Sequence, residues 1–129
     1  MNKQENILVT GGAGFIGSHL VDNLLATGDR HVTVVDNFNE FYAPEIKRAN
    51  LAAHRDDARF KLYEADICCP QTLQRIFSDN RFDTIVHLAA WAGVRPSLLN
   101  PKLYAAVNVS GTLNLLELAK DFGVRQFVF

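Results

Sequence analysis

Short apolar runs alternate with longer segments of helical periodicity along the whole chain of 129 residues. Residues 32–35, Val-Thr-Val-Val, are continuous and mostly β-branched, which is typical of a strand covered on both faces. Within residues 104–122, apolar side chains recur at helical spacings of four and three, at Val109, Leu113, Leu116 and Ala119. Three more apolar residues widen this predicted helix face: Leu115, Leu118 and Phe122. Because strands that alternate with helices form parallel sheets with right-handed crossovers, we predict an α/β fold with a doubly wound parallel sheet.

The same patterns place strands at residues 7–10, 32–35, 60–63, 84–88 and 126–129. Helices are predicted at residues 15–27, 45–54, 70–77 and 104–122. The third strand is the more polar one, so we expect it nearer an edge of the sheet. Ligands of open parallel sheets bind beyond the carboxyl ends of the strands, where the strand order reverses. The binding residues should therefore follow the strands directly.

Composition excludes several classes of protein. The net charge of −1 excludes binding of nucleic acid mainly by bulk charge, and 48% hydrophobic residues argue against disorder. The chain has no apolar run of about 18 residues and no signal-peptide core, so we expect a cytoplasmic protein without a membrane segment. The adjacent Cys68 and Cys69 would close a strained disulfide ring and are too few for a zinc site, so no metal is predicted.

A glycine-rich segment, residues 10–17, lies between the first predicted strand and the first predicted helix. Gly11 would permit a tight turn, Gly14 would let a pyrophosphate approach the backbone, and Gly17 would let the helix lie close to the sheet. The amino end of the helix offers free N–H groups and a partial positive charge to phosphates. This context predicts a Rossmann-type dinucleotide site; the alternative is a glycine-rich turn that binds nothing.

Asp36 closes the second predicted strand, nineteen residues after Gly17. This is about the distance of the acidic residue that binds the adenosine ribose in such folds. A carboxylate there would repel the 2′-phosphate of NADP, and no Arg between Val32 and Tyr42 could bind that phosphate. We therefore predict NAD as the cofactor, the alternative being an Asp that only opens a turn before Asn37.

Later motifs carry weaker signals. Asp66 could bind the adenine amino group with Ile67 against the ring, or it could cap the helix that follows. His87 is predicted to be a buried, hydrogen-bonded histidine more than a catalytic base. Trp91 could be a wall of the site or a loop anchor, and Arg95 could bind an anionic substrate or be a solvated surface charge.

The chain resembles the extended short-chain dehydrogenase/reductase superfamily, in its branch of NAD-dependent nucleotide-sugar epimerases and dehydratases. Five motifs stand in the order of that family: Thr-Gly-Gly-Ala-Gly-Phe-Ile-Gly at residues 10–17, Val-Val-Asp-Asn-Phe at 34–38, Asp-Ile at 66–67, His-Leu-Ala-Ala at 87–90 and Asn-Val-Ser-Gly-Thr at 108–112. Residues 90–95 together with 36–39 are most similar to UDP-glucuronate 4-epimerases. Ala92 stands where the UDP-galactose branch usually carries a Lys, which counts against that substrate.

The resemblance implies one set of cofactor-binding residues, with pyrophosphate, ribose, adenine and nicotinamide contacts in chain order. They are Gly11, Gly14, Phe15, Ile16, Gly17, Asp36, Asn37, Phe38, Asn39, Asp66, Ile67, Leu88, Ala89, Ala90 and Asn108. Arg95 and Ser97 are expected on the substrate side.

The family performs its chemistry with a Ser or Thr after the fifth strand and a Tyr-x-x-x-Lys on the next helix, and this sequence contains no Tyr-x-x-x-Lys. The resemblance therefore implies that the catalytic residues come after Phe129. We expect residues 1–129 to be the amino-terminal part of an NAD-binding Rossmann domain, truncated after the fifth strand and inactive alone. The catalytic Tyr/Lys segment and the sugar-binding domain would be absent. We also expect a homodimer, or association through the truncated edge near Phe127 and Phe129.

The expected parent is a 4-epimerase that converts UDP-glucuronate to UDP-galacturonate through a transient 4-keto sugar, with a UDP-sugar as its partner molecule. Two alternatives stay open. The first is a fragment of a nucleotide-sugar 4,6-dehydratase or decarboxylase, which begins with the same oxidation. The second, of another class, is a non-catalytic module that binds NAD without turnover.

Overall fold

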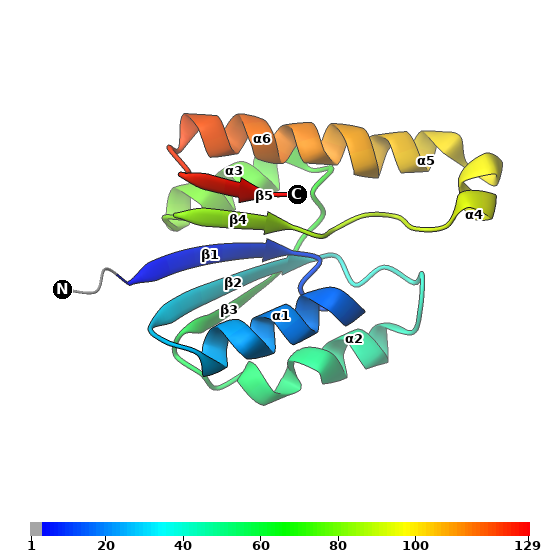
Figure 1. Ribbon diagram of the computed structural model, residues 1–129. Helices are drawn as coiled ribbons and strands as arrows, with labels where there is room; N and C mark the ends of the chain where they lie inside the picture. The colour runs from blue at the N-terminus through cyan, green and yellow to red at the C-terminus, as the bar shows by residue number, and fades with distance from the viewer. Residues whose placement is uncertain (1–3) are drawn as a thin grey trace.

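The computed structural model describes residues 4–129, which form one parallel sheet flanked by helices (Figure 1). The strands are β1 (Glu5–Thr10), β2 (Arg30–Asp36), β3 (Phe60–Glu64), β4 (Thr84–His87) and β5 (Gln126–Val128). The helices between the first four strands are α1 (Phe15–Ala26), α2 (Pro44–Leu51), the short η1 (Ala52–His54) and α3 (Pro70–Asp79). Between β4 and β5 lie α4 (Val94–Leu99), α5 (Pro101–Ala105), the π-helical η2 (Ala106–Gly111) and α6 (Thr112–Asp121).

The strand order is β3-β2-β1-β4-β5, and every neighbouring pair is parallel. This confirms the predicted Rossmann-type doubly wound sheet and the edge position of the third strand. The chain winds in one direction from β1 to β3 and in the other from β4 to β5. The order therefore reverses between β1 and β4, whose carboxyl ends lie side by side where Thr10 pairs with His87.

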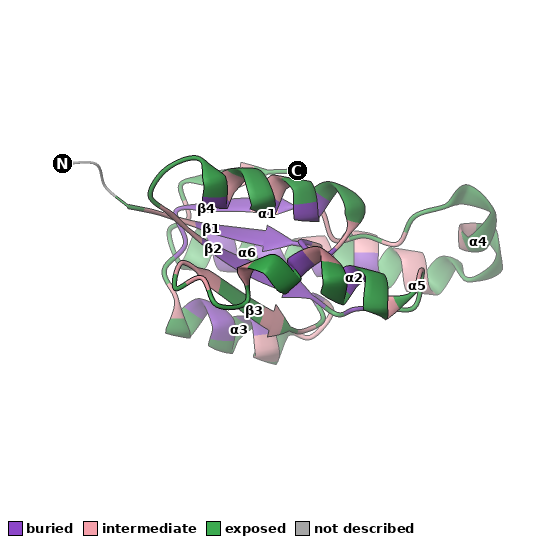
Figure 2. Cartoon of the chain, turned by 90° about the horizontal axis from the view of Figure 1, so that it is seen from below, coloured by how far each residue is buried: buried purple, intermediate pink, exposed green. Residues whose placement is uncertain are grey.

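Helices cover both faces of the sheet and bury two separate cores. Figure 1 shows α1 and α2 on one face and α3 with the α5–η2–α6 segment on the other. Alternate residues of β1 point to opposite faces, so Val9 packs in the α1 core and Leu8 packs in the α3–α6 core. The second core contains Phe77 and Leu115, which have almost no exposed surface. In Figure 2 the central strands are accordingly buried, whereas α4 and much of α5 are exposed and project beyond the sheet.

The last predicted strand ends one residue earlier than expected. Its pairing with β4 stops where Val86 lies opposite Val128, so Phe129 belongs to no strand and the prediction is wrong at this residue. Phe129 is 86% exposed, with its ring centroid 5.7 Å from that of His87. Apolar character extends a predicted strand whether or not the neighbouring strand offers a partner, and here the ladder has already ended.

The helix predicted over residues 104–122 begins earlier, at Pro101, because the side chain of Asn100 accepts a hydrogen bond from the Leu103 N–H. The six-residue α4 was not predicted at all; its residues lie between the predicted strand at 84–88 and the predicted helix at 104–122. Proline at the first position and a capping amide before it are start signals that lie upstream of the apolar pattern. The periodicity therefore located the helix but not its first turn.

The predicted buried face of this helix is wrong in its main stripe. Val109, Leu113 and Leu116 are exposed, whereas Leu115, Leu118 and Ala119 are buried. The helix instead turns Gly111 toward the core, where a Cβ would lie 2.7 Å from the Ile67 side chain. A close approach of this kind needs a residue without a side chain, and a count of apolar residues assigns such a glycine to neither face.

Two matched leucine truncations test which face is buried. Leu115→Ala should lower the free energy of unfolding by about 2–5 kcal/mol, because its side chain has 0% exposure and its loss leaves a cavity. Leu113→Ala, at 54% exposure, should change it by no more than about 0.5 kcal/mol. Urea unfolding of both variants measures the difference. Equal losses would contradict the described packing.

Candidate functional site

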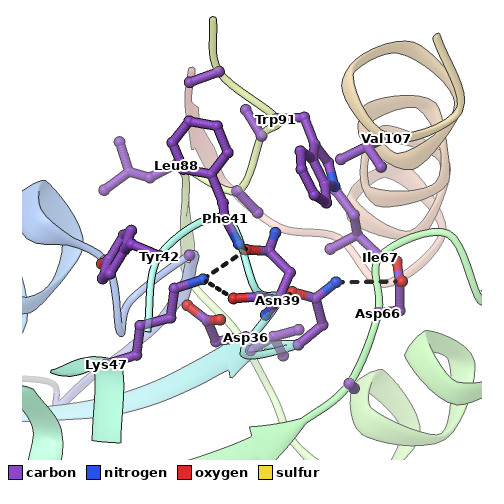
Figure 3. Close-up of a pocket in the computed structure, with 18 residues that line it drawn as sticks. Asp36, Asn39, Phe41, Tyr42, Lys47, Asp66, Ile67, Leu88, Trp91 and Val107 are labelled. Atoms are coloured by element: carbon purple, nitrogen blue, oxygen red, sulfur yellow. Dashed lines mark hydrogen bonds between the residues drawn. The ribbon is translucent and has the colours of Figure 1, made fainter. Parts of the chain in front are cut away.

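A pocket opens at the carboxyl edge of the sheet, across the reversal between β1 and β4 (Figure 3). Its walls come from the loops after all four of the strands β1 to β4 and from η2. The lining residues are Gly11, Gly14, Val35, Asp36, Asn37, Asn39, Phe41, Tyr42, Lys47, Ala65, Asp66, Ile67, Leu88, Ala89, Ala90, Trp91, Ala92 and Val107. Most residues predicted to contact a cofactor are thus brought together at one site, although they come from separate parts of the chain.

The loop between β1 and α1 and the first turn of the helix pack so tightly against other backbone that Gly11, in the loop, and Gly17, in α1, have no room for a side chain. Gly11 adopts φ +70° and donates to the Val35 carbonyl at 2.9 Å, and a Cβ on it would lie 2.7 Å from the Ala89 nitrogen. A Cβ on Gly17 would lie 2.7 Å from the Gly12 Cα. Gly17 therefore brings α1 close to the loop itself, more than to the sheet as predicted.

Gly14 leaves an open cradle at the amino end of α1. It precedes the helix in extended conformation, and no side chain caps the helix and no acidic residue lies in its first turn. The first N–H groups of a helix have no partner within it. A Cβ on Gly14 would lie 3.3 Å from the Gly11 oxygen and 3.8 Å from the Tyr42 hydroxyl. Uncapped N–H groups beside a space that only glycine leaves free fit a phosphate group.

Asp36 ties this cradle to the loop after β2. Its Oδ2 accepts from the Ala13 N–H at 3.0 Å, and its Oδ1 accepts from the Phe38 N–H at 2.9 Å. The side chain is buried but lines the pocket. Each carboxylate oxygen has more than one lone pair, so the group can accept further hydrogen bonds from a ligand. It therefore opens a turn, as the alternative prediction held, and also faces the site.

Asp66 and Asn37 form a rim of the pocket at the ends of β3 and β2. Asn37 Nδ2 lies 3.4 Å from Asp66 Oδ2, and Asp66 Oδ1 accepts from the Cys68 N–H at 2.8 Å. Helix α3 has no side-chain cap, so Asp66 does not cap it; the alternative predicted for this residue is wrong. Ile67 is buried beneath the rim.

A buried chain of hydrogen bonds fixes the end of β4. The Thr10 hydroxyl oxygen accepts from the N–H groups of Leu88 and Ala89, both at 3.2 Å, and lies 2.6 Å from His87 Nδ1. On its other side, His87 Nε2 lies 2.8 Å from the Thr112 hydroxyl. That hydroxyl donates to the Asn108 carbonyl at 2.8 Å, so its oxygen must accept from Nε2.

The Thr10 oxygen already accepts two N–H groups, so its hydroxyl donates to His87 Nδ1 and does not accept from it. His87 is therefore neutral, with its proton on Nε2. Burial lowers the pKa of His87 below its usual value, in agreement with this assignment. The residue is thus the buried, hydrogen-bonded histidine that the sequence predicted. Its place in the structure is to hold the backbone of residues 88–89, which forms the floor of the pocket.

Asn108 holds the backbone of Trp91, which forms a wall of the pocket. Its amide accepts from the Trp91 N–H at 2.9 Å and donates to the Trp91 carbonyl at 3.0 Å. The indole stacks edge-on against Phe41, with ring centroids 5.8 Å apart. Trp91 is therefore both a wall of the site and the anchor of its loop, and Asn108 lies behind this wall and does not line the pocket.

Several predicted residues lie outside the pocket. Phe15 and Ile16 expose their side chains on the first turn of α1 and do not line the pocket. Phe38 is buried in the α1 core with the Arg48 guanidinium 4.4 Å from its ring. Arg95 and Ser97 lie on α4, away from the lining residues. The binding roles predicted for these residues stay predictions.

Phe129, after which the catalytic groups are expected, does not line the pocket either. Its neighbour in space is His87, whose ring lies beneath the pocket floor. The structure places none of the expected catalytic residues, so their position after Phe129 stays a prediction, as does association near this residue.

The pocket also contains residues that the sequence analysis missed. Phe41, Tyr42 and Lys47 all come from the segment between β2 and α2 or the first turns of α2. That segment follows a strand at the carboxyl edge, so its position alone could have indicated them. Its residues have no periodic pattern, and none matched a motif.

Other features of residues 4–129 bear on function. In this part of the chain, no group of three or more His, Cys, Asp or Glu side chains is placed to hold a metal ion. Nor does any helix there combine the length and the apolar character needed to cross a membrane. Both cysteines are free thiols. Burial raises the pKa of Cys68 to about 11, whereas a hydrogen bond with Thr72 lowers the pKa of Cys69.

Residues 8–129 match the family model described as GDP-mannose 4,6 dehydratase. The UDP-glucuronate 4-epimerase of Thermodesulfobacterium geofontis is 47% identical over 121 residues, which are 94% of this chain and 37% of that protein. UDP-glucose 4-epimerase 2 of Arabidopsis thaliana is 38% identical over 125 residues, 97% of this chain and 35% of that protein. The chain thus spans little more than a third of these relatives.

Solved structures agree with this similarity. The UDP-glucuronic acid 4-epimerase from Bacillus cereus, in complex with UDP-glucuronic acid and NAD, matches 95% of this chain and 38% of its own, with a TM-score of 0.85 and 36% identity. The UDP-glucose 4-epimerase of Thermus thermophilus, in complex with NAD, matches 96% and 36%, with a TM-score of 0.81 and 38% identity. NAD in both complexes agrees with the cofactor predicted from the sequence.

The His87 assignment predicts a loss of stability in mild acid. The folded state holds the pKa of His87 below the value of about 6.5 expected in the unfolded chain. As the pH falls through 6.5, the unfolded chain therefore takes up a proton that the folded chain does not, and the free energy of unfolding decreases. Above pH 6.5 this contribution is fully present.

Urea unfolding at about pH 7.5 and pH 5.5 measures this effect in the unmutated chain and in His87→Gln. Glutamine can still accept and donate between the two threonines but does not titrate in this range. The unmutated chain should lose more stability on acidification than the variant. Every other group of the chain is the same in both proteins, so its contribution cancels in the comparison. An equal loss would show that His87 is not held neutral.

Proposed function

The chain belongs to the GDP-mannose 4,6-dehydratase family, and from that premise we propose that it is the NAD-binding part of a nucleotide-sugar 4-epimerase acting on a UDP-hexuronic acid. The observation that carries the proposal is the Asp36 carboxylate beside the Gly14 cradle, in a pocket that spans the reversal of strand order. A buried anion next to an uncapped helix end fits a ligand with a diol on one side and phosphates on the other.

In this proposal three loops, those after β1, β2 and β3, bind the adenosine half of NAD and its pyrophosphate. The N–H groups at the start of α1 bind the pyrophosphate above Gly14. Asp36 accepts hydrogen bonds from the ribose hydroxyls while it keeps its bonds to Ala13 and Phe38. Asp66 accepts from the adenine amino group, and the buried Ile67 packs under the ring.

Residues 88–90 would hold the nicotinamide half. Bound NAD supplies an acceptor and donor of hydride at the sugar C4. The chain itself supplies the apolar residues 88–90, whose backbone Thr10 and His87 hold in place, and the Trp91 wall that excludes water. We place the groups that move the hydroxyl proton in a part of the parent enzyme that follows this chain.

The substrate class rests on the relatives. A UDP-glucuronate 4-epimerase is among the most similar curated proteins, and a solved one contains UDP-glucuronic acid. UDP-glucose 4-epimerases are comparably similar, and a solved one has a higher sequence identity to this chain than the solved UDP-glucuronic acid 4-epimerase, so the hexuronic acid is the more specific part of the proposal. The family model is itself described by a 4,6-dehydratase, which keeps that activity as the second candidate.

Turnover tests the activity. A parent enzyme containing this chain should convert UDP-glucuronate to UDP-galacturonate, whereas residues 1–129 alone should not, because they contain no Tyr-x-x-x-Lys. Supplying the parent separately with UDP-glucuronate and with a nucleotide hexose that carries a C6 hydroxyl distinguishes the candidates by anion-exchange chromatography. A 4,6-dehydratase would eliminate water from the hexose and release a stable 4-keto-6-deoxy sugar, whereas a 4-epimerase would not. Epimerisation by the isolated chain at the rate of the parent would refute the proposal that the catalytic groups lie outside residues 1–129.

Calorimetric titration tests the cofactor. A carboxylate about 4 Å from the 2′-phosphate of NADP costs on the order of 4 kcal/mol per pair of charges at an effective dielectric near 20. The Lys47 ammonium lines the same pocket and offsets part of this repulsion. We therefore expect NAD to bind about a hundredfold more tightly than NADP.

Asp36→Asn should reduce that preference, mainly by weakening NAD. Asp66→Asn removes an equal charge from the same pocket, but from the adenine side, and should leave the ratio of the two affinities unchanged. Tighter binding of NADP by the unmutated chain would show that the ribose pocket is wrongly assigned.

A further inference from the structure

The Tyr42 hydroxyl is a buried polar group that the folded chain does not use. Its oxygen has almost no exposed surface and no hydrogen-bond partner among residues 4–129. A buried hydroxyl without a partner costs free energy, so each such group in a folded protein calls for an explanation, and a bound ligand that completes the hydrogen bond is one. The hydroxyls of Tyr63 and Tyr104, by contrast, bond to Asn80 and to the Ala92 carbonyl.

The position of this hydroxyl points to a phosphate. It lies 3.8 Å from the place that a Gly14 Cβ would take, directly over the uncapped start of α1. Figure 3 shows Tyr42 at the edge of the pocket toward α1, on the same side as Asp36 and Lys47. A ligand phosphate bound at the helix end would come within hydrogen-bonding reach of the phenol.

Lys47 adds a positive charge behind the ring. Its side chain is only 5% exposed, and its ammonium donates to the Asn39 carbonyl at 2.9 Å and to Asn39 Oδ1 at 2.7 Å. It also lies 4.8 Å from the centre of the Tyr42 ring. None of the ion pairs formed within residues 4–129 includes it, so its buried charge is balanced by neutral oxygens and an aromatic face. Buried charges usually have a partner of opposite sign.

We propose that the Tyr42 hydroxyl donates a hydrogen bond to a pyrophosphate oxygen of the dinucleotide, with the Lys47 ammonium as the counter-charge that supports this contact. The inference rests on the proposed NAD site and adds a loop contribution to the helix end. The two residues stand five positions apart, at the end of the loop and in the first turns of α2, so a single segment presents both to the ligand.

The protonation state of Tyr42 agrees with a donor. Burial, and after it the Asp36 carboxylate, raise the pKa of Tyr42 above its usual value of 10. The phenol therefore keeps its proton throughout the physiological range and can donate to an anion. A phenolate there would repel the phosphate.

Tyr42→Phe isolates this contact, because it removes a hydroxyl that has no partner in the free chain. Its urea unfolding midpoint should not fall below that of the unmutated chain. Its affinity for NAD and for ADP should drop about ten- to hundredfold, as expected for a lost hydrogen bond to a charged group. Its affinity for adenosine, which has no phosphate, should be unchanged. Tyr63→Phe makes the same chemical change outside the pocket and should leave all three affinities unaltered.

The outcomes separate the two proposals. If the unmutated chain binds NAD and Tyr42→Phe binds NAD and ADP equally well or more tightly, Tyr42 does not bind phosphate and this inference is overturned alone. An equal loss for adenosine also overturns it, because the residue would then act on the nucleoside. If the unmutated chain binds none of the three ligands, the proposed NAD site fails and the inference fails with it.

Lys47→Met tests the counter-charge through its salt dependence. The affinity of the unmutated chain for ADP should fall as ionic strength rises from about 0.01 M to about 1 M, where the screening length shortens from about 30 Å to about 3 Å. The variant should bind ADP more weakly at low salt and show a flatter dependence. A salt dependence equal to that of the unmutated chain would show that the ammonium does not act on the phosphates, whatever the variant does to loop stability.

Discussion

The carboxylate of Asp36 holds together the two loops on which the whole site depends. One oxygen accepts from the glycine loop at Ala13 and the other from the loop after β2 at Phe38. Both N–H groups are otherwise buried donors, and a donor left without a partner costs about 1–3 kcal/mol. The bond therefore fixes the distance between the start of α1 and the segment that presents Tyr42 and Lys47. A ligand that spans this gap meets a surface that is already formed, which lowers the entropic cost of binding.

A second buried group, the Thr10–His87–Thr112 chain, plays the same part on the other side of the strand reversal. It links the end of β1 to the end of β4 and to the helix that covers them. Because the Thr10 oxygen takes two N–H groups from residues 88 and 89, the floor of the pocket cannot shift without breaking several hydrogen bonds together. A polar network of this kind is favourable only when every member is satisfied, and here the neutral tautomer of His87 satisfies all of them.

Much of this arrangement could be predicted from the sequence, because it depends on local rules. The β-branched runs and the glycine spacing determine where the strands end, and so located Gly14 and Asp36 at one edge of the sheet. The buried face of the long helix could not be predicted, since two apolar stripes compete and the choice depends on the close approach of Gly111 to Ile67. Tyr42 and Lys47 were missed for a different reason: the position of their segment after β2 indicates the pocket, but no motif or period shows that their side chains turn into it. Phe38 takes a positive φ of 51°, turns its own side chain into the core and brings the following residues back to the pocket.

The pocket has two chemically distinct halves. The charged and amide side chains among its lining residues all come from the β2 and β3 side: Asp36, Asn37, Asn39, Lys47 and Asp66. The β4 side contributes only apolar and aromatic residues over a hydrogen-bonded backbone. A dinucleotide has the same division, with diol, phosphates and an adenine amino group at one end and a flat ring at the other. The polar half can thus supply affinity and orientation, while the apolar half excludes water from the ring face. In the proposed parent enzyme, this leaves the reacting end of the cofactor open on the side where a sugar and the proton-transfer groups would have to meet it.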